Sequence, residues 1–170
     1  MSVSSGLQIG PATAEDLSVL SHVFPRHVLL GDRLRRQHDD RGLLLVAWQD
    51  GVPVGLIYLW WEPAEEPELR KYLPDVPLLM HLEVHIGRRN AGIGSALVRA
   101  GESLLHRAGH RRVALGVRPS NGGAARLYRR LGYVNWPHGD IETSYETVNE
   151  AGEMVRGREM CQILTKELTG

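Results

Sequence analysis

A strand that leads into a glycine-bearing turn and then a helix has the residue types and spacing needed to hold a phosphate group. Residues 84–97 follow this pattern, with the spacing Arg-x-x-Gly-x-Gly from Arg89 to Gly94. The first N–H groups of a helix lack intrahelical partners, and the helix dipole adds partial positive charge there. Gly92 and Gly94 carry no side chain that would exclude a bulky anion, and Arg88 and Arg89 add charge. The alternative is a tight turn without a ligand.

A second motif lies downstream, where an asparagine precedes a short helical run ending in Leu-Tyr, a basic turn and Gly-Tyr. It reads Asn-Gly-Gly-Ala-Ala-Arg-Leu-Tyr-Arg-Arg-Leu-Gly-Tyr from Asn121 to Tyr133. In this order the two motifs resemble those of the GCN5-related N-acetyltransferase (GNAT) family, namely Arg-x-x-Gly-x-Gly followed by Asn-x-x-Ala-x-x-Leu-Tyr. The resemblance extends from about Leu7 to Tyr133 and is closest over residues 78–133.

The resemblance implies a transferase that uses acetyl-CoA as co-substrate, without a metal, and moves the acetyl group directly to a primary amine. It also implies that backbone groups of the turn bind the pyrophosphate, while the preceding strand pairs with the pantetheine arm. Asn121 would cap its helix and reach the same arm. The residues implied in donor binding are Val84, Ile86, Arg89, Asn90, Ala91, Gly92, Ile93, Gly94, Ser95 and Asn121. The family often has proline in place of Ile86 and glycine in place of Asn90, and neither difference removes a required N–H.

The thiolate that leaves during acetyl transfer should receive a proton. The resemblance gives this role to Tyr128, the tyrosine of the Leu-Tyr pair. A tyrosine hydroxyl has a reference pKa of about 10, so it holds its proton at neutral pH. The alternative is a core tyrosine at the end of an amphipathic helix.

The amine must be neutral to react, and the strand expected from Leu78 to Ile86 carries residues that can accept its proton. Alternation along a strand places His81, Glu83 and His85 on one face. The residues on the other face are Leu82, Val84 and Ile86. Glu83 is the first candidate for the base and His81 the second; the alternative is a solvated or salt-bridged face. A β-bulge, common in this strand of the family, would change which residues face the site.

One position separates the chain from a subfamily. The ribosomal-protein N-terminal acetyltransferases have Leu-Glu-Val-Arg ahead of the asparagine motif, and that glutamate is their proposed base. Here the sequence is Leu-Gly-Val-Arg, and Gly116 cannot take a proton. The close resemblance to that subfamily therefore fails at the residue that matters most.

The acceptor side would be formed by the first two helices and residues 62–77, where family members differ most. The aromatic residues Tyr58, Trp60 and Trp61 precede a run of carboxylates, and this combination suits a cationic amine. Those carboxylates are Glu62, Glu65, Glu66 and Glu68. The alternative is a solvated acidic loop beside core aromatics. We expect a small amine as acceptor, with a peptide or protein amine as runner-up; a non-catalytic acyl-CoA sensor and a structural subunit are the alternatives from other classes.

The elements that must position these residues alternate between strands and helices, with one hairpin at Asp50-Gly51. This pattern predicts an α/β (α+β mixed) class with a GNAT-like fold. The central sheet would be mixed and mostly antiparallel, with about six or seven strands and about four flanking helices. Residues 138–157 are polar and predicted to be irregular, and Met160 to Leu168 is a candidate last strand.

Length and composition limit the number of domains, the kinds of partner and the cellular location that we expect for this protein. The 170 residues fit one domain, 1–170, and Lys plus Arg (20) equals Asp plus Glu (20), which argues against a nucleic-acid partner. The single cysteine, Cys161, excludes an internal disulfide. With no signal region and no apolar run long enough for a bilayer, we expect a cytoplasmic protein without a membrane partner. The oligomeric state, including a homodimer, stays open.

Overall fold

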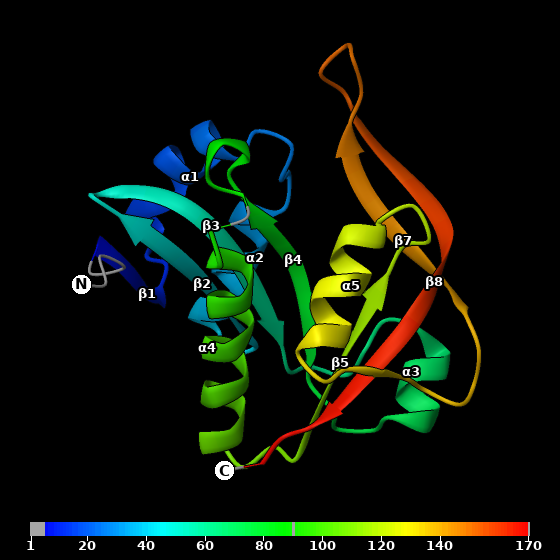
Figure 1. Ribbon diagram of the computed structural model, residues 1–170. Helices are drawn as coiled ribbons and strands as arrows, with labels where there is room; N and C mark the ends of the chain where they lie inside the picture. The colour runs from blue at the N-terminus through cyan, green and yellow to red at the C-terminus, as the bar shows by residue number, and fades with distance from the viewer. Residues whose placement is uncertain (1–5, 90, 170) are drawn as a thin grey trace.

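The computed structural model describes residues 6–89 and 91–169 of the chain. Within them lie eight strands, five α-helices and two short 3-10 turns, Ala14–Asp16 and Ile86–Arg88 (Figure 1). The strands are β1 (Leu7–Pro11), β2 (Gly42–Gln49), β3 (Val52–Trp60), β4 (Leu78–Val84), β5 (Arg112–Val117), β6 (Val134–Asn135), β7 (Ile141–Val148) and β8 (Met154–Glu167). The helices are α1 (Leu17–Val23), α2 (Leu30–His38), α3 (Pro67–Tyr72), α4 (Ile93–Arg107) and α5 (Gly122–Arg130).

The sheet has the order β1-β2-β3-β4-β5-β8-β6, with β7 paired to β8. Every pair is antiparallel except β4 with β5, which is parallel and contains one matched position in the described chain, Leu78 opposite Ala114. The two strands therefore lie side by side only at their starts and then diverge (Figure 1). The predicted mixed, mostly antiparallel sheet is confirmed.

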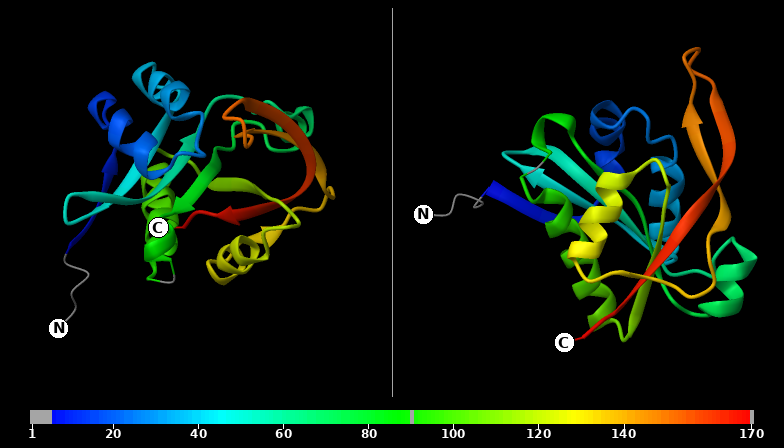
Figure 2. Two further views of the ribbon diagram at one scale, coloured as in Figure 1. Left: turned by 90° about the horizontal axis from the view of Figure 1, so that it is seen from above. Right: turned by 45° about the vertical axis from the view of Figure 1, so that its right-hand side comes forward.

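Buried apolar residues lie on both faces of the sheet because helices cover both faces. Figure 2 shows α1 and α2 on one side and α4 and α5 on the other. The α4 side contains Leu45, Ile57 and Leu97, and the α2 side contains Leu44 and Leu56. Strands covered on both faces need apolar residues at successive positions, which explains the nearly continuous apolar runs of β2 and β3.

Strand β4 contains a β-bulge in its pairing with β3. Leu56 lies opposite Glu83, whereas Tyr58 lies opposite Met80, so two steps along β3 match three along β4. Within this interval His81 has a left-handed backbone, with φ of 60°. Such a conformation is unfavourable for a residue with a Cβ atom, and it marks the position of the extra residue.

The bulge decides which side chains of β4 face which helices. Leu79 and Leu82 both pack on the α4 side. In a regular strand, residues at positions i and i+3 would face opposite sides. Val84 packs on the α4 side as well, so Glu83 between them faces the α2 side. The predicted separation of Leu82 and Val84 from Glu83 is confirmed.

The predicted extension of this strand to Ile86 is wrong. β4 ends at Val84, and Ile86 begins a 3-10 turn in which its side chain is 75% exposed. The turn competes with the strand because the His85 carbonyl accepts from the Arg88 N–H at 2.8 Å, and the His85 ring accepts from the Gly87 N–H at 3.4 Å. His85 therefore lies outside the strand face that carries His81 and Glu83.

The expectation of an irregular segment at 138–157 is also wrong. It contains all of β7 and the start of β8, which form a hairpin that extends beyond the rest of the sheet (Figure 1). Residues 162–167 of β8 pair with β5, and residues 154–161 pair with β7. One face of β7 carries β-branched and aromatic residues at every second position, and this pattern stabilises a strand even where few residues are strongly apolar. They are Ile141, Thr143, Tyr145 and Thr147.

No helix in the part of the chain that the structure describes is both long and apolar enough to cross a bilayer.

Candidate active site

The turn before α4, residues 88–89 and 91–95, is called here the α4 turn. Its central feature is Gly92, the N-cap of α4, with a left-handed backbone of φ 80°. Apart from its chain neighbours, no described residue has an atom within 4 Å of a Cβ atom added at Gly92, so open space lies in front of it among the described residues. The Ala96 N–H bonds the Gly92 carbonyl at 3.0 Å, which leaves the N–H groups of Ile93, Gly94 and Ser95 in the first turn without intrahelical acceptors.

The two glycines of the α4 turn face different surroundings. A Cβ atom at Gly94 would lie 3.4 Å from Leu127 of α5 and 3.7 Å from Val84 of β4. Both distances are ordinary van der Waals contacts, so Gly94 is packed beside α5 and β4 with room for a Cβ atom, whereas Gly92 borders open space. The sequence motif assigns both glycines to one role, and the structure separates them.

The arginines beside the α4 turn also differ. Arg89 is exposed, and its Nε donates to the Val84 carbonyl at 3.3 Å. Arg88 is half-buried and donates to the side chain of Gln49 at the end of β2. Of the residues expected to hold the donor, Asn90 lies outside the described residues and Ala91 is exposed. Arg89 is therefore the arginine with a side chain next to the open α4 turn.

Helix α5 carries the second motif. The Asn121 side chain accepts from the Ala124 N–H at 3.1 Å, which confirms it as the N-cap of α5. Tyr128 is buried, and its ring packs edge-on against Tyr133 with the ring centroids 5.6 Å apart. Burial raises the pKa of the Tyr128 hydroxyl above its ordinary value of about 10, so the group stays protonated at neutral pH.

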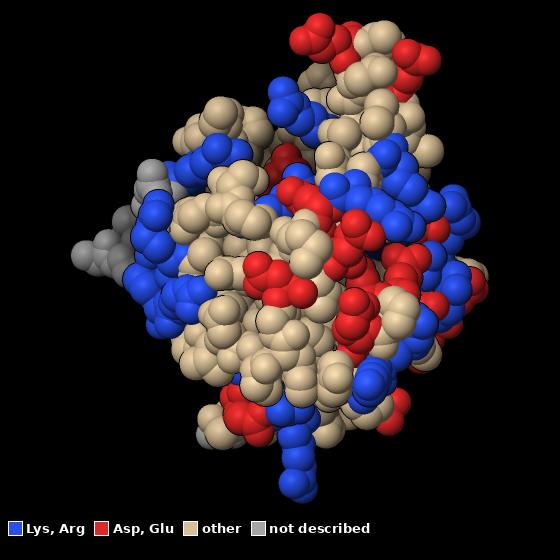
Figure 3. All heavy atoms as spheres, turned by 90° about the vertical axis from the view of Figure 1, so that its right-hand side faces the viewer, with Lys and Arg blue, Asp and Glu red and all other residues tan. Residues whose placement is uncertain are grey.

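A cleft of about 390 Å³ lies between α2, the segment leading into α3, the start of β4, the end of β5, and the β7–β8 hairpin. It is called the cleft below. Four arginines and four carboxylates line it, together with His81, Gly116, Tyr145 and Cys161. Acidic and basic side chains are interspersed over the molecular face that carries β7 and β8 (Figure 3). Of the elements expected on the acceptor side, α2 and part of the 62–77 segment line this cleft and α1 does not, while β7 and β8 add a wall that the sequence did not indicate.

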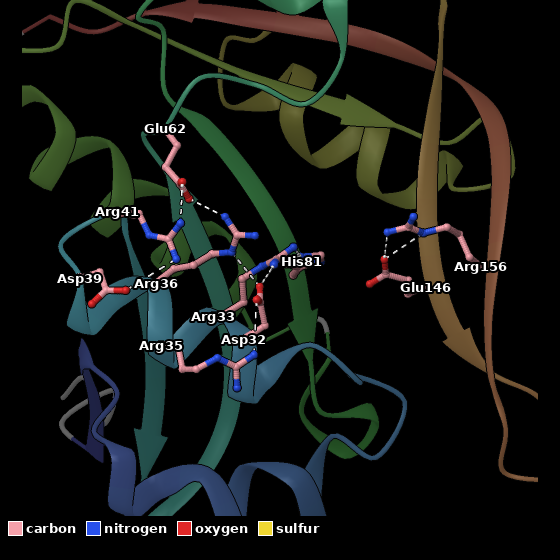
Figure 4. Close-up of polar contacts among 10 residues, drawn as sticks. All are labelled: Asp32, Arg33, Arg35, Arg36, Asp39, Arg41, Glu62, His81, Glu146 and Arg156. Carbon is pink, nitrogen blue, oxygen red and sulfur yellow. Dashed lines mark hydrogen bonds and ion pairs between the residues drawn. The ribbon is translucent and has the colours of Figure 1, made fainter.

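Most charges of the cleft are paired (Figure 4). Asp32 contacts Arg33 at 2.5 Å and Arg36 at 2.8 Å, and Arg36 also contacts Glu62 at 2.7 Å. Burial disfavours the Asp32 carboxylate, but hydrogen bonds from Arg36 and Arg33 outweigh this and hold its pKa below the ordinary value. The pairs of the other cleft arginines are Arg118 with Glu159 at 2.5 Å and Arg156 with Glu146 at 2.7 Å.

Two cleft carboxylates, Glu65 and Glu66, form no ion pair with any described residue. Glu65 is exposed and Glu66 is half-buried. Burial raises the pKa of Glu66, with further contributions from Glu65 and Glu68. The four arginines of the cleft are already paired with carboxylates. The charged groups that remain without an ion partner among the described residues are therefore the carboxylates Glu65 and Glu66, which are negative.

The two candidate bases lie in different environments. His81 lines the cleft, and its Nε2 accepts from Nε and Nη2 of Arg33 at 3.2 and 2.9 Å. Glu83 lies further along β4 and outside the cleft lining. Burial raises the pKa of Glu83, while Arg89 and Arg26 partly oppose the shift. Glu83 thus lies within electrostatic range of the α4 turn, and His81 belongs to the cleft.

Sequence reasoning missed Arg33, the buried cation at the centre of the cleft, which is 7% exposed. A signal was present, because the inward face of α2 repeats at helical spacing and one of its members is charged. That face consists of Leu30, Arg33, Leu34 and Gln37. An arginine on the face of a helix that points into the protein predicts a buried partner. The helical spacing does not identify that partner.

The model of the Acetyltransferase (GNAT) family matches residues 13–133, so the chain belongs to this family of enzymes. Solved structures share its fold. The ribosomal-protein-S18-alanine N-acetyltransferase of Escherichia coli has a TM-score of 0.66 at 19% identity, covering 96% of this chain and 95% of that one. The PaiA N-acetyltransferase of Thermoplasma acidophilum, solved in complex with coenzyme A, has a TM-score of 0.66 at 16% identity, covering 98% and 99%.

A third structure, YncA of Salmonella typhimurium with acetyl-CoA, has a TM-score of 0.66 at 17% identity and covers 96% of this chain and 95% of that one. No curated protein sequence matches the chain. The family match and the fold agree with the resemblance in the two sequence motifs, and they establish the acetyltransferase class.

Proposed function

We propose that the protein transfers the acetyl group of acetyl-CoA directly to the primary amine of a small molecule. The observation that carries this proposal is the α4 turn, where N–H groups without a partner among the described residues and a left-handed Gly92 border open space. A diphosphate is the kind of anion that such a helix start binds. We also propose a cytoplasmic location, since a chain with one cysteine lacks the disulfide framework that is common in small secreted domains.

Donor binding would use mainly backbone groups. The N–H groups of Ile93, Gly94 and Ser95 point out of the first turn of α4, and the adjacent Arg89 adds a positive charge. Beyond Leu78, the edge of β4 is not matched to β5 in the described chain, so its backbone is available to an extended arm. Asn121 lies at the neighbouring start of α5. These residues fit an acyl carrier that contains a diphosphate and amide groups.

For a cationic amine, the nitrogen must lose two protons and the leaving thiolate must gain one. Glu83 takes the first proton from the ammonium and passes it to solvent, and the second leaves the nitrogen for solvent once the new C–N bond has formed. The raised pKa of Glu83 brings the carboxylate closer to neutral pH, where a base is most effective. Tyr128 donates a proton to the sulfur as the C–S bond breaks, and it regains that proton from solvent. Its raised pKa keeps the donor protonated until that step. His81 is less suited to be the base because Arg33 occupies the lone pair of its Nε2.

The cleft supports a small cationic acceptor. Its volume of about 390 Å³ lies in the range of small-molecule sites, about 300–1,000 Å³. Glu65 and Glu66 supply uncommitted negative charge, and Tyr145 adds an aromatic wall. Gly116 of β5, in the lining of the cleft, contributes no carboxylate, so the base must come from another element.

The test is a panel of amines incubated with the purified protein and acetyl-CoA, with release of the free CoA thiol as the readout. The panel contains polyamines, amino sugars, amino-acid derivatives and short peptides. We expect turnover with at least one small cationic amine and slower turnover with peptides. Preference for peptides would reverse the proposed acceptor class, and CoA binding without turnover on any amine would favour a sensor.

A further inference from the structure

Arg33 connects three parts of the molecule through one guanidinium group. From α2 it contacts Asp32 through Nη1 at 2.5 Å and His81 of β4 through Nε and Nη2 at 3.2 and 2.9 Å. Its charged group also lies 5.3 Å from the ring centroids of Tyr58 and Trp60. All the hydrogen bonds to β4 converge on one atom, the Nε2 of His81 (Figure 4).

This contact fixes the protonation of His81. An arginine donates hydrogen bonds and has no acceptor, so Nε2 of His81 must carry its lone pair toward Arg33, and the ring proton must lie on Nδ1. The groups that face the ring from other elements, His27 before α2 and Arg118 after β5, disfavour a second proton as well. Burial is the largest cause that lowers the pKa of His81 far below its ordinary value. The ring is therefore neutral, with one tautomer.

The same residue carries the bulge of β4. His81 holds a left-handed backbone that an L-residue adopts only at an energetic cost, so contacts elsewhere must stabilise it. Without the bulge, β4 would alternate regularly from Leu79, which faces α4. Glu83 would then also face α4, since a one-residue slip moves each following side chain to the opposite face. The direction of Glu83 thus depends on the bulge at His81.

We infer that Arg33 is a positioning residue. Its hydrogen bonds to His81 stabilise the β4 bulge, and the bulge keeps the Glu83 side chain directed to the α2 side of the sheet. The inference rests on the proposed function, in which Glu83 is the base. Arg33 acts through the backbone of β4 in this account, and its charge is balanced by Asp32. His81 is a structural partner in the same account and does not take the proton from the amine.

The first test measures the tautomer of His81 by ¹⁵N NMR of the imidazole nitrogens, which requires no substrate. In the wild-type protein we expect a protonated Nδ1, an unprotonated Nε2 and no titration between pH 5 and 8. In Arg33→Met the spectrum should shift toward the Nε2-protonated form that free histidine favours. The matched control is Arg35→Met, because Arg35 also pairs with Asp32, at 3.6 Å, and its side chain is 73% exposed. A protonated Nε2 in the wild type would overturn the inference.

The second test uses rescue by glycine. On an amine found in the panel, Arg33→Met should lower kcat about tenfold, since small errors in positioning are costly, and should leave acetyl-CoA affinity within about twofold. Glycine adopts the left-handed backbone without strain. His81→Gly should therefore keep most of the activity, and the double variant Arg33→Met/His81→Gly should recover most of the loss caused by Arg33→Met.

The outcomes separate this inference from the proposed function. Loss of activity in His81→Gly, or no recovery in the double variant, would show that His81 matters for its ring and would overturn the positioning role. If Arg33→Met fails to fold, the wild-type tautomer and the His81→Gly activity still decide the question. If no amine is acetylated at all, the proposed function fails with the positioning role, while the tautomer still reports whether Arg33 grips His81.

Discussion

The α4 turn presents backbone N–H groups around Gly92, whereas the cleft is lined by charged side chains from α2, β4, β5 and the β7–β8 hairpin. The α4 turn is a local feature made of seven described residues from one short segment, 88–89 and 91–95, and it tolerates changes of side chain wherever the backbone is kept. The cleft depends on pairs such as Arg33 with His81, which are 48 positions apart. A binding site made of backbone suits a shared co-substrate, and one made of side chains suits an acceptor that differs between related enzymes.

The largest expected effect comes from closing the open space at the α4 turn. Gly92→Leu should raise the dissociation constant of acetyl-CoA about a hundredfold, equivalent to about 2.7 kcal/mol, because the side chain would project into that space. Calorimetric titration measures this. The control is Gly109→Leu, since Gly109 also has a positive φ, 98°, and open surroundings at the far end of α4. Equal losses of affinity in both variants would indicate backbone strain and remove the α4 turn from donor binding.

Tyr128→Phe should separate catalysis from binding on the α5 side. We expect kcat to fall about tenfold to a hundredfold through loss of the proton donor, with acetyl-CoA affinity nearly unchanged. The control is Tyr133→Phe, which removes a 2.7 Å hydrogen bond to Glu102 and should lower stability by about 1–2 kcal/mol while sparing kcat. An unchanged rate in Tyr128→Phe would exclude this tyrosine as the acid.

Glu83 lies between the α4 turn and the cleft, and its replacement in Glu83→Gln should lower kcat about tenfold. Because the base must be deprotonated, wild-type activity rises with pH through the raised pKa of Glu83. In the variant the acceptor must lose its own proton, so the profile shifts to higher pH. Superimposable profiles would leave the base unassigned to Glu83.

The same substitution tests the cause of the pKa shift. Burial raises the folded-state pKa of Glu83, so its contribution to stability is complete below the unfolded-state pKa and is lost as pH rises through the folded-state value. At pH 7 the charged side chain therefore costs stability. We expect Glu83→Gln to melt at a higher temperature than the wild type at pH 7 and to lose this advantage in acid. A lower melting temperature at pH 7 would contradict burial as the dominant cause.

The smallest expected effect concerns the acceptor. Glu66→Gln should raise the KM of a cationic acceptor about threefold to fivefold, as expected for loss of one partly solvated charge contact, about 0.7–1 kcal/mol. The KM of acetyl-CoA should not change. Glu68→Gln is the matched control, because Glu68 is exposed on α3 and lies outside the cleft lining. Equal KM values for Glu66→Gln and the wild type would remove this carboxylate from acceptor recognition.

The difference between the regions also explains what the sequence could predict. Strands and helices up to α5 follow from apolar periodicity, and the α4 turn and the Asn121 cap follow from local motifs. The β7–β8 hairpin was missed because β7 alternates polar with β-branched residues and contains few strongly apolar ones. The bulge could be placed at His81 only with the pairing between β3 and β4 in hand. The Arg33–His81 contact depends on two elements that meet only after folding.

The central claim is that backbone N–H groups at the start of α4 hold the diphosphate of the acetyl donor. A crystal structure of the protein with coenzyme A tests it most directly. We predict diphosphate oxygens within about 3.2 Å of the N–H groups of at least two of Ile93, Gly94 and Ser95. A diphosphate bound elsewhere, with these N–H groups facing only solvent, would contradict the account.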